Sequence, residues 1–115
     1  LVGSEMCIRD SHLVDEDFEL AKGVEVVCLA GHTPNLLGLV VHLEGQTIIL
    51  PQDCVYTSEI FGPPAKMSGF MYDSVSFLKS IEKVRRLAKK YDAKVFPAHD
   101  WEFFQTMKLA PKYYE

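Results

Sequence analysis

The sequence of 115 residues predicts an α/β domain in which short strands and one amphipathic helix form layers. Two observations lead to this fold class. Apolar, valine-rich segments alternate with turn residues in the first half of the chain, which is typical of strands. One later segment changes to a period of about 3.6 residues, which is typical of a helix with one buried face. A hydrophobic content of 48% and a net charge of −4 fit one soluble globular domain.

The expected strands lie on both sides of the helix. A first strand covers residues 23–29, and the turn-forming sequence AGHTPN follows it. Residues 36–43 and 47–53 are expected to form a hairpin, because the turn sequence EGQ lies between them. A short strand is expected within residues 93–100, whose sequence is AKVFPAHD.

The helix is expected over residues 74–90, after a loop that contains two prolines and two glycines. Asp73 or Ser74 is placed to cap its N-terminus. The apolar side chains of this segment fall on one stripe, and charged side chains occupy the opposite side. The stripe consists of Val75, Leu78, Ile81, Val84, Leu87 and Ala88. We therefore expect this stripe to face the sheet.

The first eleven residues, LVGSEMCIRDS, share no periodicity with the rest of the chain and resemble a translated sequencing-library adapter. We therefore expect residues 1–11 to be non-native and residues 12–115 to be the native part. An ordinary N-terminal tail is the alternative. A chain that begins in adapter sequence is also expected to have lost its true N-terminus.

Charge and cysteine content argue against several classes of function. A pI near 5.5 is unlike the basic surface of nucleic-acid-binding proteins, so we expect no nucleic-acid partner. No apolar run approaches the roughly 18 residues of a membrane span, so we expect no membrane partner. Within residues 12–115, Cys28 and Cys54 lie too far apart for a zinc knuckle or a disulfide framework. They favour a reducing compartment and a cytoplasmic location.

Three ionisable residues follow the ends of expected strands: His32 in AGHTPN, Asp53 in LPQDCVY and His99 in FPAHDW. Loops at strand ends hold side chains in convergent positions, so these residues are candidates for one site. Neutral imidazole and carboxylate groups are ligands that suit zinc and similar divalent ions. Their separations of 21 and 46 residues are not those of a local metal motif. An ordinary loop role for each histidine therefore stays open.

The short sequence motifs around these residues resemble the second half of the metallo-β-lactamase fold and, within that superfamily, the N-acyl homoserine lactonase family. GHTP and PAHD carry the resemblance to the superfamily. DCVYTSEIF, the Pro-rich loop, YDS before the helix, SIEKVRRLA and FPAHDWEFF resemble the lactonase branch. The resemblance covers residues 23–111 and implies the C-terminal half of an αββα sandwich.

The resemblance implies a site for two divalent metal ions, expected to be Zn²⁺. His32 would bind the first ion, His99 the second, and Asp53 would bridge them. A hydroxide between the metals would attack an ester or lactone carbonyl, while Tyr56 stabilises the developing oxyanion. The alternative for Tyr56 is a packing role in the core or at the rim.

Two neighbours of these residues also have to be interpreted. Asp100 would either hold the imidazole of His99 or cap the segment that follows. Cys54 is interpreted as a small buried residue rather than an extra ligand, because adjacent strand positions point to opposite faces.

The implied activity is quorum quenching: a metal-dependent hydrolase opens N-acyl homoserine lactones or related esters. The partner is then a small-molecule lactone or ester, and a homodimer is an open alternative. The sequence lacks the family's first motif, His-x-His-x-Asp-His, so residues 12–115 are expected to hold half the site and to be inactive alone. A thioesterase like glyoxalase II is the nearest alternative. A truncated or non-catalytic interaction domain without metals is the alternative of another class.

Overall fold

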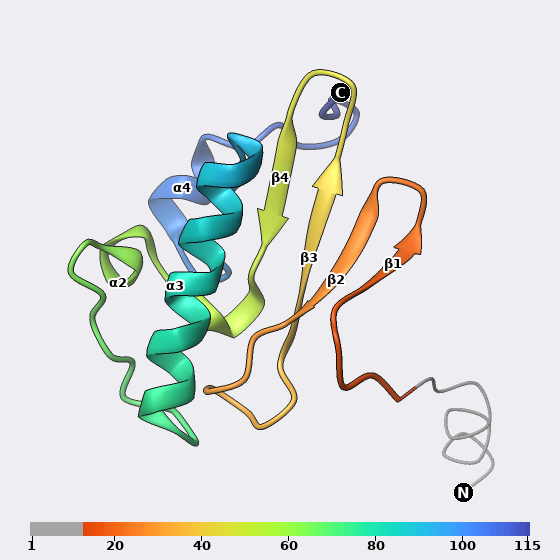
Figure 1. Ribbon diagram of the computed structural model, residues 1–115. Helices are drawn as coiled ribbons and strands as arrows, with labels where there is room; N and C mark the ends of the chain where they lie inside the picture. Colours follow the sequence, from red (N-terminus) through yellow and green to blue (C-terminus); the bar gives the residue numbers. More distant parts are fainter. Residues whose placement is uncertain (1–12) are drawn as a thin grey trace, which may run out of the picture.

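The structure, a computed structural model, describes residues 13–115 and contains a five-stranded sheet (Figure 1). The strands are β1 (Phe18–Ala21), β2 (Val24–Cys28), β3 (Leu37–His42), β4 (Thr47–Leu50) and β5 (Lys94–Val95). They lie in the sheet in chain order; β1 to β4 are antiparallel neighbours, and β5 is parallel to β4. The α/β class is confirmed. The segment expected to be adapter-derived, residues 1–11, lies outside the described residues, so its origin stays a prediction.

The helices follow β4. They are the 3-10 helix η1 (Gln52–Cys54), α2 (Ser58–Phe61), α3 (Ser74–Tyr91) and α4 (Trp101–Gln105). The long helix α3 is the crossover that lets β5 return parallel to β4. Figure 1 shows it alongside β4, with β3, β2 and β1 following in order. No helix among residues 13–115 has the length and apolar character needed to cross a lipid bilayer.

The expected hairpin forms, but its second strand is shorter than expected. The N–H of Leu43 donates to the carbonyl of Gln46 at 2.9 Å and closes the turn between β3 and β4. The expectation that this strand continues to Asp53 is wrong, because β4 ends at Leu50. Pro51 follows and has no N–H to extend the strand ladder. Asp53 therefore lies in the tight turn η1.

The first strand of the sheet, β1, has no counterpart among the expected strands. Its four residues, FELA, form a short edge strand with an exposed glutamate, and its register with β2 is irregular. Short charged edge strands carry little hydrophobic periodicity. Pairing with β2, rather than any local pattern, defines this element.

The helix α3 forms where expected, but its buried stripe differs. The expectation that Val75 and Leu78 face the sheet is wrong, because these side chains are 58% and 41% exposed. Phe77, Ile81 and Val84 are fully buried instead. Three residues of an α-helix turn through about 300°, which is about 60° less than a full turn. Each step of three from Ile81 back to Leu78 and then to Val75 therefore moves the side chain about 60° further from the direction of the sheet.

The sheet has two faces that differ in their cover. We call the side of Val27, Val40 and Ile49 the helix face, because these residues pack with Phe77 and Ile81 of α3 in one buried cluster. We call the opposite side the far face. Strand register assigns the following residues to the far face: Val24, Val26, Leu37, Leu39, Val41, Ile48 and Leu50. Val26 and Ile48 are buried, and the others are half-buried.

Candidate functional site

Three strands direct the candidate residues to one edge of the sheet. Both β2 and β4 are antiparallel to β3, so they run in the same direction, and β5 is parallel to β4. The C-terminal ends of these three strands therefore lie at the same edge. His32 follows β2, Asp53 follows β4 and His99 follows β5. The sheet topology thus brings together residues that are 21 and 46 positions apart.

The carboxylate of Asp53 lies between the two imidazoles. Nε2 of His99 donates to Oδ1 of Asp53 at 2.8 Å. Nε2 of His32 lies 3.5 Å from Oδ2 of the same carboxylate. Each carboxylate oxygen therefore faces one imidazole. The side chain of His32 is 20% exposed and that of His99 is 60% exposed, so the site opens to solvent on the side of His99.

The second ring nitrogen of His32 defines which tautomer the loop favours. Nδ1 of His32 lies 3.1 Å from the carbonyl oxygen of Phe70 and 2.9 Å from the hydroxyl of Tyr56. A carbonyl oxygen can only accept, so these contacts assign the proton to Nδ1. The lone pair is then on Nε2, the nitrogen that faces Asp53. This is the nitrogen that a metal ion beside Asp53 would require.

Tyr56 lies between both histidines. Its ring stacks on the imidazole of His99, with centroids 5.0 Å apart, and its hydroxyl oxygen accepts from Nδ1 of His32. Partial burial, together with the negative charge of Asp53, raises the pKa of the Tyr56 hydroxyl above its ordinary value. The phenol therefore keeps its proton at neutral pH. Its oxygen accepts from His32, and the side chain of Ser68 is a further hydrogen-bond partner of this hydroxyl.

The loop that carries His32 is held against the start of α3. A Cβ atom on Gly31 would lie 2.4 Å from Cα of Phe77, and the φ angle of +142° at Gly31 disfavours other residues. The carbonyl of Gly31 accepts from the N–H groups of Tyr72 and Asp73 at 2.9 and 3.0 Å. The hydroxyl of Ser80 in α3 donates to the carbonyl of Ala30 at 2.7 Å. These contacts fix the backbone on which His32 is mounted.

The structure decides between the two interpretations of Asp100 in favour of the cap. One carboxylate oxygen accepts from the N–H of Phe103 at 2.9 Å, at the N-terminus of α4. The other accepts from the N–H and the hydroxyl of Ser58 at 2.9 and 2.7 Å. These donors lower the pKa of the Asp100 carboxyl below its ordinary value. Asp100 therefore ties α4 to α2 directly beside His99.

The interpretation of Cys54 as a buried residue agrees with its 0% exposure, although the reason differs from the one expected. Cys54 and Asp53 are neighbours in the turn η1, not in a strand, and the turn directs Cys54 into the core cluster. Burial raises the pKa of the Cys54 thiol to about 12. The thiol is therefore protonated at neutral pH, whereas a metal ligand must be a thiolate.

Two parts of this site are not predicted by the sequence analysis. The carbonyl of Phe70, which orients His32, leaves no signal in a sequence because every residue has a carbonyl group. Ser58, which holds Asp100, is preceded by Thr57, whose side chain caps α2. The sequence Thr-Ser-Glu is a recognisable helix start, so this element had a usable signal.

The donors fit a two-metal site in kind and in pairing, but not in number. Each oxygen of Asp53, with the imidazole that faces it, provides one carboxylate and one imidazole donor. Zinc sites have at least three protein ligands per ion. Among residues 13–115, no group of three or more His, Cys, Asp or Glu side chains is arranged to hold a metal ion. Further ligands would have to complete such a site.

Known proteins of similar sequence are lactonases. Over 104 residues, the chain is 33% identical to the N-acyl homoserine lactonase AiiB of Agrobacterium fabrum. This match covers 88% of this chain and 38% of that protein. An N-acyl homoserine lactonase of a Bacillus species is 31% identical over 102 residues, covering 88% of this chain and 40% of that protein. The chain thus spans about two fifths of the length of the curated relatives it matches. No family model matches the chain.

Solved structures of similar fold agree with these relatives. An N-acyl homoserine lactone hydrolase with the product N-hexanoyl-L-homoserine at its catalytic metal centre superposes with a TM-score of 0.81 at 28% identity. The match covers 90% of this chain and 41% of that chain. AidC, a dizinc quorum-quenching lactonase, has a TM-score of 0.67 at 18% identity, covering 84% and 33% of the two chains, and supports the fold alone.

The fold and the edge site together define the class: this chain has part of the metallo-β-lactamase fold. Within that class, the sequence relatives are more specific. The chain is a homologue of the N-acyl homoserine lactonases, as its short sequence motifs predict.

Proposed function

We propose that this chain supplies part of the active site of a metal-dependent lactonase that opens N-acyl homoserine lactones or related esters. One observation carries the proposal: the carboxylate of Asp53 has one imidazole at each of its oxygens. A carboxylate in this position can be shared by two cations, since their mutual repulsion requires an anion between them. The similarity to proteins named as lactonases supports the substrate class.

In this proposal, His32 and Asp53 hold one divalent metal ion, and His99 and Asp53 hold the other, with Zn²⁺ suited to both. Bound there, the metal ions would supply an activated water nucleophile and polarise the carbonyl group of the substrate. The chain itself positions the donors. The Phe70 carbonyl sets the tautomer of His32, and the stacked Tyr56 ring supports His99.

Tyr56 acts on the substrate in this proposal. Its hydroxyl keeps its proton at neutral pH and directs its oxygen to His32; in this proposal the carbonyl oxygen of a lactone replaces the Ser68 side chain as its partner and accepts that proton. That oxygen gains negative charge as the nucleophile adds to the carbonyl carbon, before the ring opens, and a hydrogen bond to it becomes stronger in that transition state. Loss of one such donor typically costs about 10²- to 10³-fold in kcat.

The remaining ligands are proposed to come from an N-terminal half that carries His-x-His-x-Asp-His. The two donors per metal ion at Asp53 support this, because they fall short of a zinc site. The length relation to the curated relatives is consistent with it. Residues 13–115 alone are then expected to be inactive toward lactones.

A hybrid protein tests the proposal. The portion of the Agrobacterium fabrum lactonase that precedes its matched segment would be joined ahead of residues 13–115, and folding would be checked by circular dichroism. We expect hydrolysis of N-hexanoyl homoserine lactone that a chelator abolishes and added Zn²⁺ restores. A thioester assayed in parallel is expected to be a poorer substrate.

The matched variants are Asp53→Asn and Asp15→Asn, which remove the same charge at the site and away from it. We expect the first to lower kcat at least 10³-fold and the second to have little effect. A folded hybrid whose hydrolysis survives chelation or the Asp53→Asn change would refute the proposal.

A further inference from the structure

The two candidate histidines are held in different ways. The side chain of His32 is 20% exposed, and Nδ1 of its ring lies 3.1 Å from the carbonyl oxygen of Phe70. The side chain of His99 is 60% exposed; its ring stacks on Tyr56, and its Nε2 donates to Asp53. An imidazole that lies largely in solvent gains little restraint from packing. The position of the His99 ring therefore depends on how its backbone is held.

Backbone hydrogen bonds join the segment that carries His99 to the segment that follows Asp53. The N–H of Ala98 donates to the carbonyl of Val55 at 2.9 Å, and the N–H of His99 donates to the carbonyl of Tyr56 at 2.8 Å. Asp53 lies in the turn η1, which ends just before Val55. The two hydrogen bonds thus fix the backbone of one candidate metal ligand relative to the other.

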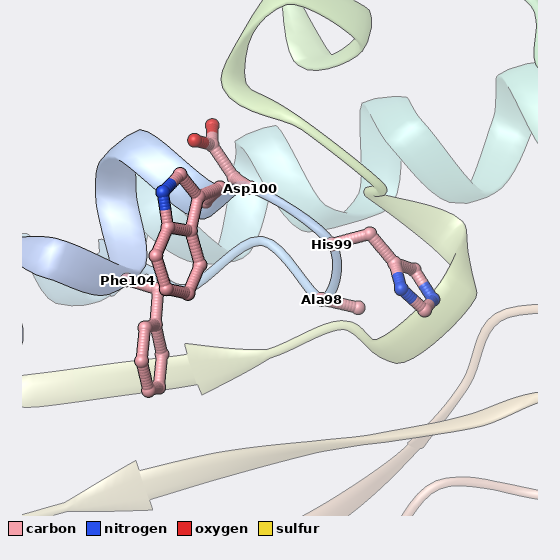
Figure 2. Close-up of a pocket in the computed structure, with 5 residues that line it drawn as sticks. Ala98, His99, Asp100 and Phe104 are labelled. Carbon is pink, nitrogen blue, oxygen red and sulfur yellow. The ribbon is translucent and has the colours of Figure 1, made fainter.

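Ser58 extends this connection beyond His99. Its N–H and its hydroxyl donate to one carboxylate oxygen of Asp100 at 2.9 and 2.7 Å. The other oxygen accepts from the N–H of Phe103 and caps α4. Figure 2 shows the carboxylate of Asp100 and the imidazole of His99 pointing in different directions from adjacent positions. Asp100 therefore acts on His99 through the backbone that they share.

We propose that Ser58 is a positioning residue for His99 and acts through Asp100. The hydrogen bond at the His99 N–H has the pair of Ala98 and Val55 on one side and the contact of Ser58 with Asp100 on the other. Removal of the second support leaves His99 at the end of the connection, where hydrogen bonds open most readily.

The consequence for metal binding rests on the proposed function. With Ser58 in place, Nε2 of His99 stays beside the carboxylate of Asp53, where the proposed metal ion would need it. Removal of a group that orients a metal ligand without touching the ion typically lowers metal affinity about 10- to 100-fold. We therefore expect Ser58→Ala to weaken Zn²⁺ binding by the hybrid protein by about this factor.

Amide hydrogen exchange of the 115-residue chain, followed by NMR, tests the positioning itself without metal or substrate. The His99 amide reports on the connection, and the Phe96 amide, which donates to the carbonyl of Ile49 at 2.9 Å, reports on the sheet. In Ser58→Ala, we expect the His99 amide to exchange about tenfold faster, because a hydrogen bond to a charged group is lost. The Phe96 amide is expected to change less than about twofold.

Three further variants locate the effect. Ser58→Thr keeps a hydroxyl and is expected to restore slow exchange at His99. Ser74→Ala is the matched control, because Ser74 is an exposed serine at the first position of α3 as Ser58 is of α2, and it is expected to leave exchange at His99 unchanged. Asp100→Asn removes the charge that Ser58 contacts. We expect it to match Ser58→Ala, and the double variant to add little, since both changes remove the same interaction.

Three results would overturn the proposal. One is equal acceleration of the His99 and Phe96 amides in Ser58→Ala, because Ser58 would then stabilise the whole fold. The others are unchanged exchange at His99 and fully additive effects of Ser58→Ala and Asp100→Asn. If circular dichroism shows that Ser58→Ala does not fold, Asp100→Asn is judged by the same comparison of the two amides.

Failure of the proposed function gives a different pattern. A folded hybrid protein that binds no metal, together with faster exchange at His99 alone, would refute the proposed function and leave Ser58 as a positioning residue. A hybrid that binds two metal ions, together with unchanged exchange and unchanged Zn²⁺ affinity in Ser58→Ala, would refute the positioning role and leave the proposed function.

Discussion

The two faces of the sheet carry similar aliphatic side chains but differ in how completely they are buried. On the helix face, Val27, Val40 and Ile49 are at most 1% exposed beneath α3. On the far face, Leu39 and Val41 are only half-buried, although they are equally apolar. A sheet with apolar residues on both faces is normally enclosed between two layers. The far face therefore has the composition of a buried surface that residues 13–115 cover only in part.

The candidate site resembles the far face, because the described residues complete neither of them. The carboxylate of Asp53 has an imidazole at each oxygen, yet each pair falls short of a zinc ligand set. The described residues thus provide only part of the cover of the far face and only part of a zinc ligand set. The comparison teaches that the helix face is closed by the described residues themselves, while the far face is covered, and the zinc ligand set supplied, only in part by them.

The largest expected effect compares neighbouring residues on β4 that point to opposite faces. Ile49→Ala removes a fully buried side chain from the helix face and is expected to cost about 2–5 kcal/mol of unfolding free energy. Leu50→Ala on the far face is expected to cost about 1–2 kcal/mol, because part of the side chain already meets water. Urea denaturation of both variants measures the difference. Equal losses would mean that the two faces are equally covered.

A second comparison concerns the helix that covers the helix face. The carboxylate of Asp73 accepts from the N–H groups of Val75 and Ser76, both at 3.1 Å, and caps α3. A hydrogen bond from the Ser76 side chain is the largest cause that lowers the pKa of the Asp73 carboxyl, and these two backbone hydrogen bonds lower it further. Its stabilising contribution is therefore present above the ordinary value of 3.8 and is lost as the pH falls through the lowered folded-state pKa.

Thermal unfolding followed by circular dichroism checks the role of this cap. Asp73→Ala is expected to lower the melting temperature by a few degrees at neutral pH, because two N–H groups lose their acceptor. Asp73→Asn keeps an acceptor and should retain most of the neutral-pH stability, but lose this residue's share of the acid dependence. A melting temperature that is unchanged in Asp73→Ala would show that the cap contributes nothing to covering the helix face.

The smallest effect uses the two cysteines as reporters. Cys54 is fully buried in the core cluster, whereas Cys28 pairs with Leu37 on the far face and is half-buried. Burial raises the pKa of both thiols, and that of Cys54 reaches about 12. Iodoacetamide at pH 8 should therefore modify Cys28 faster than Cys54, as read by peptide mass spectrometry. Faster modification of Cys54 would contradict the packing assigned to η1.

Local patterns in the sequence predict those elements that local forces determine. The β3–β4 hairpin follows from its turn residues, and α3 from its period and from Asp73. The exact stripe does not follow, since Phe77 and Val75 are both apolar and only the position of the sheet selects Phe77. The edge strand β1 is likewise defined by its partner rather than by its own pattern.

The candidate site is likewise predictable from the sequence only in part. His32, Asp53 and His99 are identifiable from residue type, from their place at strand ends and from family words. Their contact depends on three strands sharing one direction, which no local pattern contains. The contribution of Phe70 comes from its backbone, and the place of Asp100 beside His99 comes from its hydrogen bonds to Ser58 of α2. These features require the folded chain.

The most direct test of the central claim is the metal content of the hybrid protein, measured by inductively coupled plasma mass spectrometry after removal of free metal. The proposed function predicts two divalent metal ions per chain, because Asp53 with His32 and Asp53 with His99 would hold one ion each. The Asp53→Asn variant should lose at least one of them. A folded hybrid with no bound metal, or with two ions that remain in Asp53→Asn, would contradict the account.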